Sequence, residues 1–352
     1  MRSRARAPRL KDIAEDLGLS IMAVSKALRG HTDIGVETRR RVVERALELN
    51  YSPNLLPMQM LTGRTRTIGM VIPSMHITYF GQLVHGVTVR TRQHGYQLLL
   101  CNSEGNPENE REQVRTLLAR QVEGIILASA GPLRDRDELS FLLDCGIPYV
   151  LAGRGKPAFP ANFLGSDGVA IGRAVTEHLI DQGYRRIAHI QGAAVAGSAQ
   201  RREGYLQALA AHGRVVAQEY VAGPADGIEA GCAAMGQLMQ CKPMPDAVFC
   251  YTDLVAGGAM RAILEAGLRI PADIALAGVG NLIFSDLLKI PLTTVEQHPQ
   301  VLGEEAAALI LAFADGKKIK TPIQRFVPFE LVTRESTERR GRTPMQKTRR
   351  VS

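Results

Sequence analysis

The sequence predicts two fold classes in one chain: an all-α helix-turn-helix domain at the N-terminus, then a two-lobed α/β domain with doubly wound parallel sheets. Apolar residues recur at helical spacing in three short segments within the first fifty residues. From residue 67 short apolar strands alternate with helices, in two series of similar size. At 352 residues the chain has room for both parts.

The helix-turn-helix prediction rests on residues 10–29. A first helix over residues 10–17 has apolar residues at positions 10, 13, 14 and 17, which fall on one face. Gly18 can take the left-handed backbone geometry that ends a helix. Ser20 is a good N-cap for a second helix over residues 21–29, and the three residues between the helices match the connection of this motif.

The second helix has two chemically different faces. Val24, Ala27 and Leu28 share one side and can pack on the first helix. The other side mixes apolar, hydroxyl and cationic groups, which suits a DNA groove better than bare water. A solvated helix with stray apolar residues is the alternative that two helices alone leave open.

Residues on the outward face have the groups that read DNA. Ile21 and Met22 can contact thymine methyl groups, and Lys26 can reach guanine acceptors. Serine hydroxyls at both ends of this face can bond phosphates. The DNA-binding residues expected from the helix-turn-helix are Lys11, Ser20, Ile21, Met22, Ser25, Lys26 and Arg29.

A third helix is predicted over residues 36–50, and it can close a small domain that two helices cannot. Arginines at positions 39, 40, 41 and 45 are expected to point largely outward. The residues expected to point inward are Val42, Val43, Ala46, Leu47 and Leu49.

The motifs that follow carry a specific resemblance. The third helix ends in Leu-Asn-Tyr at 49–51, and Pro-Asn at 53–54 and Thr-Gly-Arg-Thr at 62–65 come after it. In this order the segment resembles the lac repressor family of bacterial transcription regulators. The resemblance implies that the second helix enters the major groove, where Ile21, Met22 and Lys26 would read bases.

The resemblance also implies a hinge helix and linker over residues 54–66 that orders on DNA. Asn54 would cap this helix, and Met60 takes the position of the leucine that the family inserts into the minor groove. Methionine is among the side chains that can wedge between base pairs. Pro57 departs from the family pattern, because proline is tolerated only in a first helical turn and restricts the hinge helix to a short one.

Composition and charge point to an intracellular nucleic-acid-binding protein. Residues 1–66 contain 13 Lys and Arg against 7 Asp and Glu, and residues 338–352 contain 6 against 1. Positive charge gathered on one small module suits phosphate contacts, whereas the basic tail is expected to be solvated. No run of 18 apolar residues and no hydrophobic signal segment occurs, so we expect a cytoplasmic, nucleoid-associated protein. Five cysteines without a Cys-x-x-Cys pair predict free thiols and no metal site.

The larger domain divides into two βα series. The first has strands over 68–72, 96–101, 124–130 and 149–152, with helices over 80–94, 109–120 and 137–145. The second has helices over 171–182, 200–212, 228–239 and 254–266, with strands over 186–191, 247–250 and 274–278 and a further strand within 215–221. The family resemblance implies that residues 293–297 and a helix over 301–315 return to the first lobe, and that residues 326–332 return to the second.

Family-like phrases extend over residues 9–337, among them Val122-Glu-Gly-Ile-Ile-Leu and Pro291-Leu-Thr-Thr-Val. In this family the two-lobed part resembles periplasmic sugar-binding proteins, forms the homodimer and binds a small effector between the lobes. Core packing is an open alternative for Tyr79 and Phe80, and a structural cap for Asp253. The effector-binding residues carried over from the family are Tyr79, Phe80, Arg154, Arg201, Phe249, Thr252, Asp253 and Asn281.

Two departures from the family concern the effector. Gly280 replaces the family's ligand-binding aspartate, and the segment ending in Gly153-Arg154 keeps only the arginine of an Asp-Arg pair. The loss of carboxylates predicts a more positive cleft, in which Arg154 and Arg201 favour an anionic partner. We therefore expect a sugar acid or a phosphorylated sugar rather than a neutral hexose.

No nucleotide-binding, metalloprotease or serine-hydrolase motif occurs, so the prediction is a non-enzymatic, effector-controlled regulator without a cofactor. The alternative is a sugar-receptor binding protein without a DNA-binding role. The expected segments are a basic disordered arm (1–8), the helix-turn-helix domain (9–53), the hinge helix and linker (54–66), the two-lobed domain (67–337) and a basic flexible tail (338–352). The tail lacks leucine heptads, so we expect a dimer and not a coiled-coil tetramer.

Overall fold

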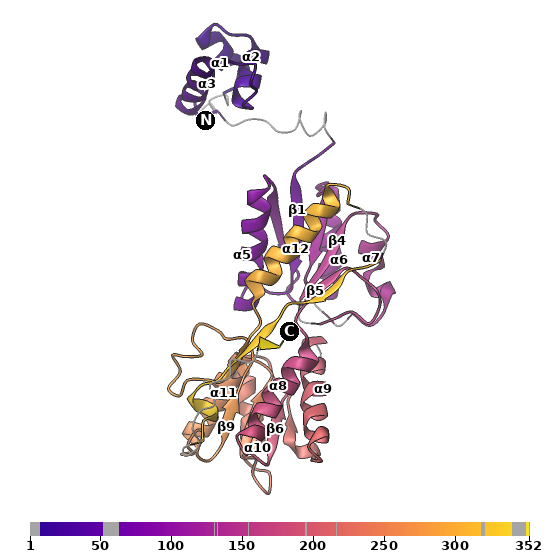
Figure 1. Cartoon of the computed structure of the whole chain (residues 1–352), viewed down its shortest axis with the longest axis vertical. Coiled ribbons are helices and arrows are strands. Elements are labelled where there is room, and N and C mark those ends of the chain that lie inside the picture. The colour runs from indigo at the N-terminus through magenta and orange to yellow at the C-terminus, as the bar shows by residue number, and fades with distance from the viewer. Residues whose placement is uncertain are drawn as a thin grey trace, which may run out of the picture. The chain divides into compact units, whose positions relative to one another are not determined.

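The computed structural model describes residues 8–51, 63–129, 131, 133–153, 155–193, 196–215, 217–317, 321–339 and 350–351. The predictions about Asn54, Pro57, Met60 and Arg154 fall outside these residues. The chain forms two compact units, Met1–Thr65 and Arg66–Ser352 (Figure 1).

The N-terminal unit has the predicted three helices, α1 (Leu10–Leu17), α2 (Ile21–Leu28) and α3 (Val36–Glu48). Gly18 ends α1 with a φ of 65°, in the left-handed region. The Ser20 side chain caps α2 by accepting a hydrogen bond from the backbone N–H of Ala23 at 3.1 Å. The predicted turn and cap are therefore confirmed.

The core of this unit is small, and it corrects part of the prediction for α3. Val42 is fully buried and Ala46 nearly so, but Val43 is 41% and Leu47 72% exposed. The expectation that these last two point inward was wrong, because the stripe through Val42 and Ala46 already covers the narrow contact with α1 and α2. The buried core residues are Ile13, Ala14, Val24, Ala27, Val42 and Ala46.

Replacing Ser20 with alanine is expected to destabilise the start of α2 by about 1 kcal/mol, because the Ala23 N–H loses its side-chain acceptor. Hydrogen–deuterium exchange should then accelerate roughly fivefold for the first amides of α2. Ser25→Ala, within the same helix, is the matched control and should change exchange little. Equal rates in the two variants would show that the cap contributes nothing.

The first lobe of the larger unit has helices on both faces of a parallel sheet (Figure 1). Its described strands are β1 (Thr67–Ile72), β2 (Gln97–Asn102), β3 (Gly124–Leu127), β4 (Tyr149–Gly153), β5 (Phe163–Gly165) and β11 (Gln324–Phe326). Their order is β11-β5-β4-β3-β1-β2, and every neighbouring pair is parallel. The helices are α5 (Thr78–Gln93), α6 (Pro107–Ala119), η1 (Arg136–Leu139), α7 (Ser140–Leu143) and α12 (Pro299–Ala314).

Alternation along β1 shows how this sheet is covered. Met70 faces the core under α5 and α12, whereas Val71 faces the core under α6 and α7. Both side chains are fully buried, as expected for a strand in the middle of a parallel sheet.

The second lobe repeats the plan on a smaller sheet. Its described strands are β6 (Ile187–Ile190), β7 (Val221–Ala222), β8 (Ala247–Cys250) and β9 (Ala275–Ala277), in the parallel order β7-β6-β8-β9. Its helices are α8 (Gly168–Asp181), α9 (Ala196–Ala211), η2 (Gln218–Tyr220), α10 (Gly227–Leu238) and α11 (Asp253–Glu265). Helices α8 and α9 cover one face, and α10 and α11 cover the other.

The crossings between the lobes correct several expectations. Strand β10 (Thr294–Glu296) pairs antiparallel with β12 (Phe329–Val332) beside the second lobe, so the prediction that residues 293–297 return to the first lobe was wrong. The first-lobe strands β5 and β11 were not predicted. Part of the expected flexible tail, β13 (Arg350–Val351), pairs with β12.

Three helix pairs of the larger unit cross through pairs of glycines that leave no room for a side chain. A Cβ on Gly172 of α8 would overlap the carbonyl oxygen of Arg201 on α9, and a Cβ on Gly204 of α9 would overlap that of Val169. The same reciprocal contact joins α10 to α11 and α5 to α12. The position of Arg201 therefore depends on a backbone contact with α8.

Candidate DNA-binding face and effector cavity

The outward face of α2 presents the apolar groups that the sequence predicts there. Ile21 is 49% and Met22 70% exposed, whereas Val24 and Ala27 on the opposite face are buried. Two adjacent exposed apolar side chains form a small patch that a partner could cover. Ser25 lies on the same helix, and Ser20 is its N-cap.

Charged side chains around this face are held by ion pairs or by a backbone hydrogen bond. The Nζ atom of Lys26 lies 2.5 Å from Oδ2 of Asp33, in the loop between α2 and α3. Lys11 pairs with Glu15 at 3.3 Å, one turn along α1. The Nε–H of Arg29 donates to the carbonyl oxygen of Ser25.

Two of the arginines on α3 are also paired with carboxylates. Arg40 bonds both Glu37 and Glu44. Arg45 bonds Asp16, which ties α3 to α1, and also Glu48 at the end of its own helix. Much of the positive charge within the three helices is therefore neutralised by neighbouring carboxylates.

A cavity of about 690 Å³ lies between the two lobes, where the carboxyl ends of the parallel strands point. Tyr79 and Phe80 of α5 line it from the first lobe, with their rings in an edge contact. Arg201 and Thr252 line it from the second lobe. Four of the eight predicted effector residues thus meet at one cavity.

Arg201 is 1% exposed and is oriented by groups that also face the cavity. Its Nη1 donates to the carbonyl oxygen of Tyr251 at 2.6 Å, and its Nη2 donates to Oε1 of Gln297 at 3.1 Å. The guanidinium carbon lies 5.0 Å from the centre of the Tyr251 ring. These contacts fix the direction of the guanidinium before a ligand binds.

Other predicted effector residues lie away from the cavity wall. Phe249 is fully buried in the core beneath α8 and α9. The carboxylate of Asp253 accepts hydrogen bonds from Oγ1 of Thr294 at 2.6 Å, from Oγ of Ser285 at 2.7 Å and from the Leu282 N–H at 3.0 Å. Burial raises the pKa of Asp253, and these bonds oppose the rise. Asp253 thus holds the loop after β9, whereas the N-cap of α11 is Thr252, so the side chain has a structural contact other than the cap that the sequence offered.

Asn281 is similarly engaged outside the cavity. Its Nδ2 donates to Oε2 of Glu296 at 2.9 Å, and its Oδ1 accepts from Nη2 of Arg334 at 2.8 Å. The neighbouring Gly280, which replaces the family aspartate, does line the cavity. The backbone at this position therefore faces the cavity, and the side chain after it joins the segment to β10.

Sequence reasoning missed acidic and amide groups on the cavity wall. Glu104 lies in the loop after β2 and Asp226 in the loop after β7, so both come from the carboxyl ends of strands, where ligands gather in such folds. They add two carboxylates to a cleft that the sequence predicts to be more positive. Gln297 also lines the cavity, and its buried Nε2 has no hydrogen-bond partner among the described residues.

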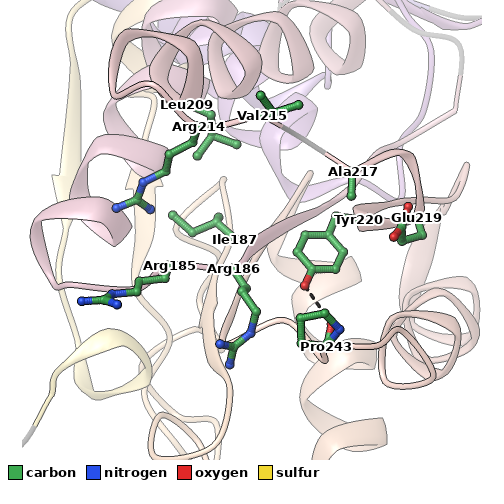
Figure 2. A pocket seen from close by; sticks show the side chains of 10 residues that line it. All are labelled: Arg185, Arg186, Ile187, Leu209, Arg214, Val215, Ala217, Glu219, Tyr220 and Pro243. Carbon is green, nitrogen blue, oxygen red and sulfur yellow. Dashed lines mark hydrogen bonds between the residues drawn. The ribbon is translucent and has the colours of Figure 1, made fainter.

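A second, smaller hollow of about 190 Å³ lies at the amino end of β6 in the second lobe, opposite the ligand-facing strand ends. Figure 2 shows Tyr220 pointing toward Pro243, and its hydroxyl donates to that carbonyl oxygen at 2.7 Å. Arg186 donates to the carbonyl oxygen of Met244, and Arg214 donates to that of Tyr184. These arginines brace loops of the lobe.

Other titratable groups have structural surroundings. His189 is buried between Tyr205 and Phe249, and desolvation lowers its pKa to about 3. Burial also raises the pKa of the Cys250 thiol. Within the described residues no cluster of His, Cys, Asp and Glu could hold a metal ion, and no helix is long and apolar enough to cross a membrane.

Comparison with known proteins decides the family. Residues 9–54 match the model of bacterial regulatory proteins of the lacI family, and residues 65–328 match that of periplasmic binding proteins and the sugar-binding domain of the LacI family. The chain belongs to the LacI family. It is therefore a DNA-binding transcription regulator and not an enzyme.

Known proteins are similar to this chain over nearly its whole length. The transcriptional repressor PurR of Pasteurella multocida (strain Pm70) is 30% identical over 94% of this chain and 99% of its own length. The structure of the lac repressor dimer bound to operator and the anti-inducer ONPF has a TM-score of 0.85 at 27% identity, over 95% and 100% of the two chains. The transcriptional regulator CelR in complex with cellobiose has a TM-score of 0.70 at 30% identity, over 94% and 99%.

Proposed function

We propose that this LacI-family protein is a homodimeric repressor that binds a specific duplex operator through α2 and is controlled by a small metabolite bound between its lobes. The observation that carries the proposal is the exposed pair Ile21 and Met22 beside Lys26 on a helix whose other face is buried. The lac repressor structure, a dimer bound to operator, supports the same arrangement.

The proposed DNA-binding residues of the N-terminal unit divide into those that contact bases and those that contact the phosphate backbone. Ile21, Met22 and Lys26 would contact bases, while the hydroxyls of Ser20 and Ser25 would bond phosphates. Lys11 and Arg29 would add cationic contacts with the backbone. By resemblance to the family, Asn54 and Met60 would extend the contact into the minor groove.

Effector binding would act through the segments that cross between the lobes. A ligand that contacts Tyr79 and Phe80 from one lobe and Arg201 and Thr252 from the other favours one angle between them. The first lobe is connected to the DNA-binding segment through the chain at residue 66. The angle between the lobes can therefore shift the equilibrium between dimers that bind the operator and dimers that do not.

The cavity suits a hydroxylated metabolite that carries an anionic group. Its aromatic walls can take the apolar face of a sugar ring, and Glu104 and Asp226 can accept hydrogen bonds from hydroxyls. The Arg201 guanidinium favours a carboxylate or phosphate, to which arginine donates paired bonds. CelR bound to cellobiose supports a carbohydrate ligand, and we propose a sugar acid or phosphorylated sugar.

Calorimetry with glucose, gluconate and glucose 6-phosphate, and with the corresponding galactose series, tests the effector class. We expect the anionic members to bind more tightly than the neutral sugar of the same series. Tighter binding of the neutral sugar throughout would overturn the acidic assignment without affecting the DNA-binding proposal.

Selection from a randomised duplex pool, followed by mobility-shift measurement, tests the DNA-binding proposal. We expect the protein to enrich an inverted repeat, because a two-fold dimer reads two equivalent half-sites. A receptor-type binding protein without a DNA-binding role would enrich no sequence.

Lys26→Ala is expected to weaken binding of the selected duplex by about 1–3 kcal/mol if the ammonium contacts a base. The affinity for a scrambled duplex of the same composition should fall much less, because that duplex offers no matched acceptor to the lysine. Fluorescence anisotropy on both duplexes measures the difference. An equal loss on both would reassign Lys26 to a phosphate contact.

A further inference from the structure

Asp33 lies beside the proposed base-reading face and was not among the predicted DNA-binding residues. It follows α2 in the loop before α3, and its Oδ2 lies 2.5 Å from Nζ of Lys26. The side chains of Lys26 and Asp33 are 36% and 53% exposed, so the pair lies at the surface. The pairing lowers the pKa of Asp33, and the carboxyl is ionised at neutral pH.

A carboxylate at this place changes the charge of Lys26 but leaves donors with which the lysine can still bond a base. It cancels the lysine charge, so the pair contributes little to the attraction of the phosphate backbone, which is independent of sequence. It leaves two of the three N–H donors of the ammonium free to bond a base. One donor can stay on Asp33 while the other two reach the O6 and N7 acceptors of a guanine.

Other ion pairs among the described residues of the unit, which include Lys11 with Glu15 on α1, also neutralise positive charge. Arg40 and Arg45 are each bonded to two carboxylates within the three helices, as described above. These pairs weaken the general attraction to DNA, but neither arginine lies on α2. Asp33 is therefore distinguished by its contact with a side chain of the reading face itself.

We propose that Asp33 is a specificity-determining residue: it restrains and neutralises Lys26, so that the lysine discriminates between bases instead of binding phosphates generally. This inference rests on the proposed DNA-binding function. Its consequence is that the wild-type protein gains operator preference by giving up affinity for unrelated DNA.

Asp33→Asn tests this by removing the charge while keeping the shape. On a scrambled duplex we expect affinity to rise about fivefold, and the slope of log affinity against log salt to steepen by about one, because the freed ammonium can displace a counterion. On the duplex selected by the wild-type protein we expect a change below about twofold, since the lysine there already contacts a base. The operator preference therefore falls.

Glu48→Gln is the matched control, because it also removes one carboxylate from an ion pair of the same unit. Glu48 is the last residue of α3, whereas Asp33 lies before the start of that helix. A helix of 13 residues is about 20 Å long, so the two carboxylates are far apart. The control should change both duplexes by the same factor. In a Lys26→Ala background, Asp33→Asn should also act equally on both duplexes, because no lysine remains to redirect.

If Asp33→Asn changed the affinity for both duplexes by the same factor in the wild-type background, the inference would be overturned. It would also be overturned if Asp33→Asn still changed the two affinities by different factors in the Lys26→Ala background. A wild-type protein that selects no duplex would instead overturn the proposed function. Circular dichroism of each variant checks that the helices are intact. The two failures are therefore distinguishable.

Discussion

Arg201→Met is expected to remove the effector response while leaving operator affinity of the ligand-free protein unchanged within about a factor of two. Charge-assisted hydrogen bonds contribute roughly 1.5–3 kcal/mol each, so the loss of a bidentate contact should weaken effector binding by about 100-fold or more. The reason lies in the fixed guanidinium, which Tyr251 and Gln297 orient toward the cavity.

The measurement is calorimetric titration with the tightest-binding sugar acid or sugar phosphate of the panel, alongside operator anisotropy with and without it. Arg202→Met is the matched control, because it changes the next residue of α9, whose side chain is exposed. The control should retain effector binding. Retained binding in Arg201→Met, with the thermal midpoint unchanged, would remove Arg201 from the effector site.

Gly172→Ala is expected to lower the free energy of unfolding of the larger unit by about 2 kcal/mol or more, which is large for a single added methyl group. The new Cβ would overlap the carbonyl oxygen of Arg201, which belongs to the backbone of α9 and cannot rotate away. Helices α8 and α9 must therefore separate. Because Arg201 moves with α9, effector affinity should fall as well.

Gly236→Ala is a control that is expected to raise the free energy of unfolding instead of lowering it. Gly236 lies inside α10, and a Cβ there meets no atom within 4 Å. Alanine should therefore stabilise the helix by about 0.5–1 kcal/mol through its better helix propensity. Denaturant unfolding of both variants measures the two effects. Equal stability of Gly172→Ala and the wild-type protein would show that the crossing tolerates a side chain.

Local patterns predict the helices well because short-range chemistry determines them. Gly18 and Ser20 set the ends of α1 and α2 by their own backbone and side-chain properties. The same reasoning failed for Val43 and Leu47, since an apolar residue next to the buried stripe looks identical in sequence whether or not a partner covers it. Strand β5 was missed because three residues carry too little periodicity.

The cavity shows a different limit. Arg201 and Thr252 could be carried over position by position from the family, but Glu104 and Asp226 come together only through the packing of two lobes. The strand-end rule could have indicated both acids. The pair of Lys26 with Asp33 joins residues seven apart across a turn, and only the geometry of that loop brings them into contact.

Anisotropy with the selected and scrambled duplexes, from 50 to 200 mM salt (roughly the range over which phosphate contacts weaken most), tests the central claim most directly. If α2 reads bases, affinity for both duplexes should fall with salt while the preference for the selected duplex persists or grows. Equal affinity for the two duplexes at every salt concentration would contradict the account.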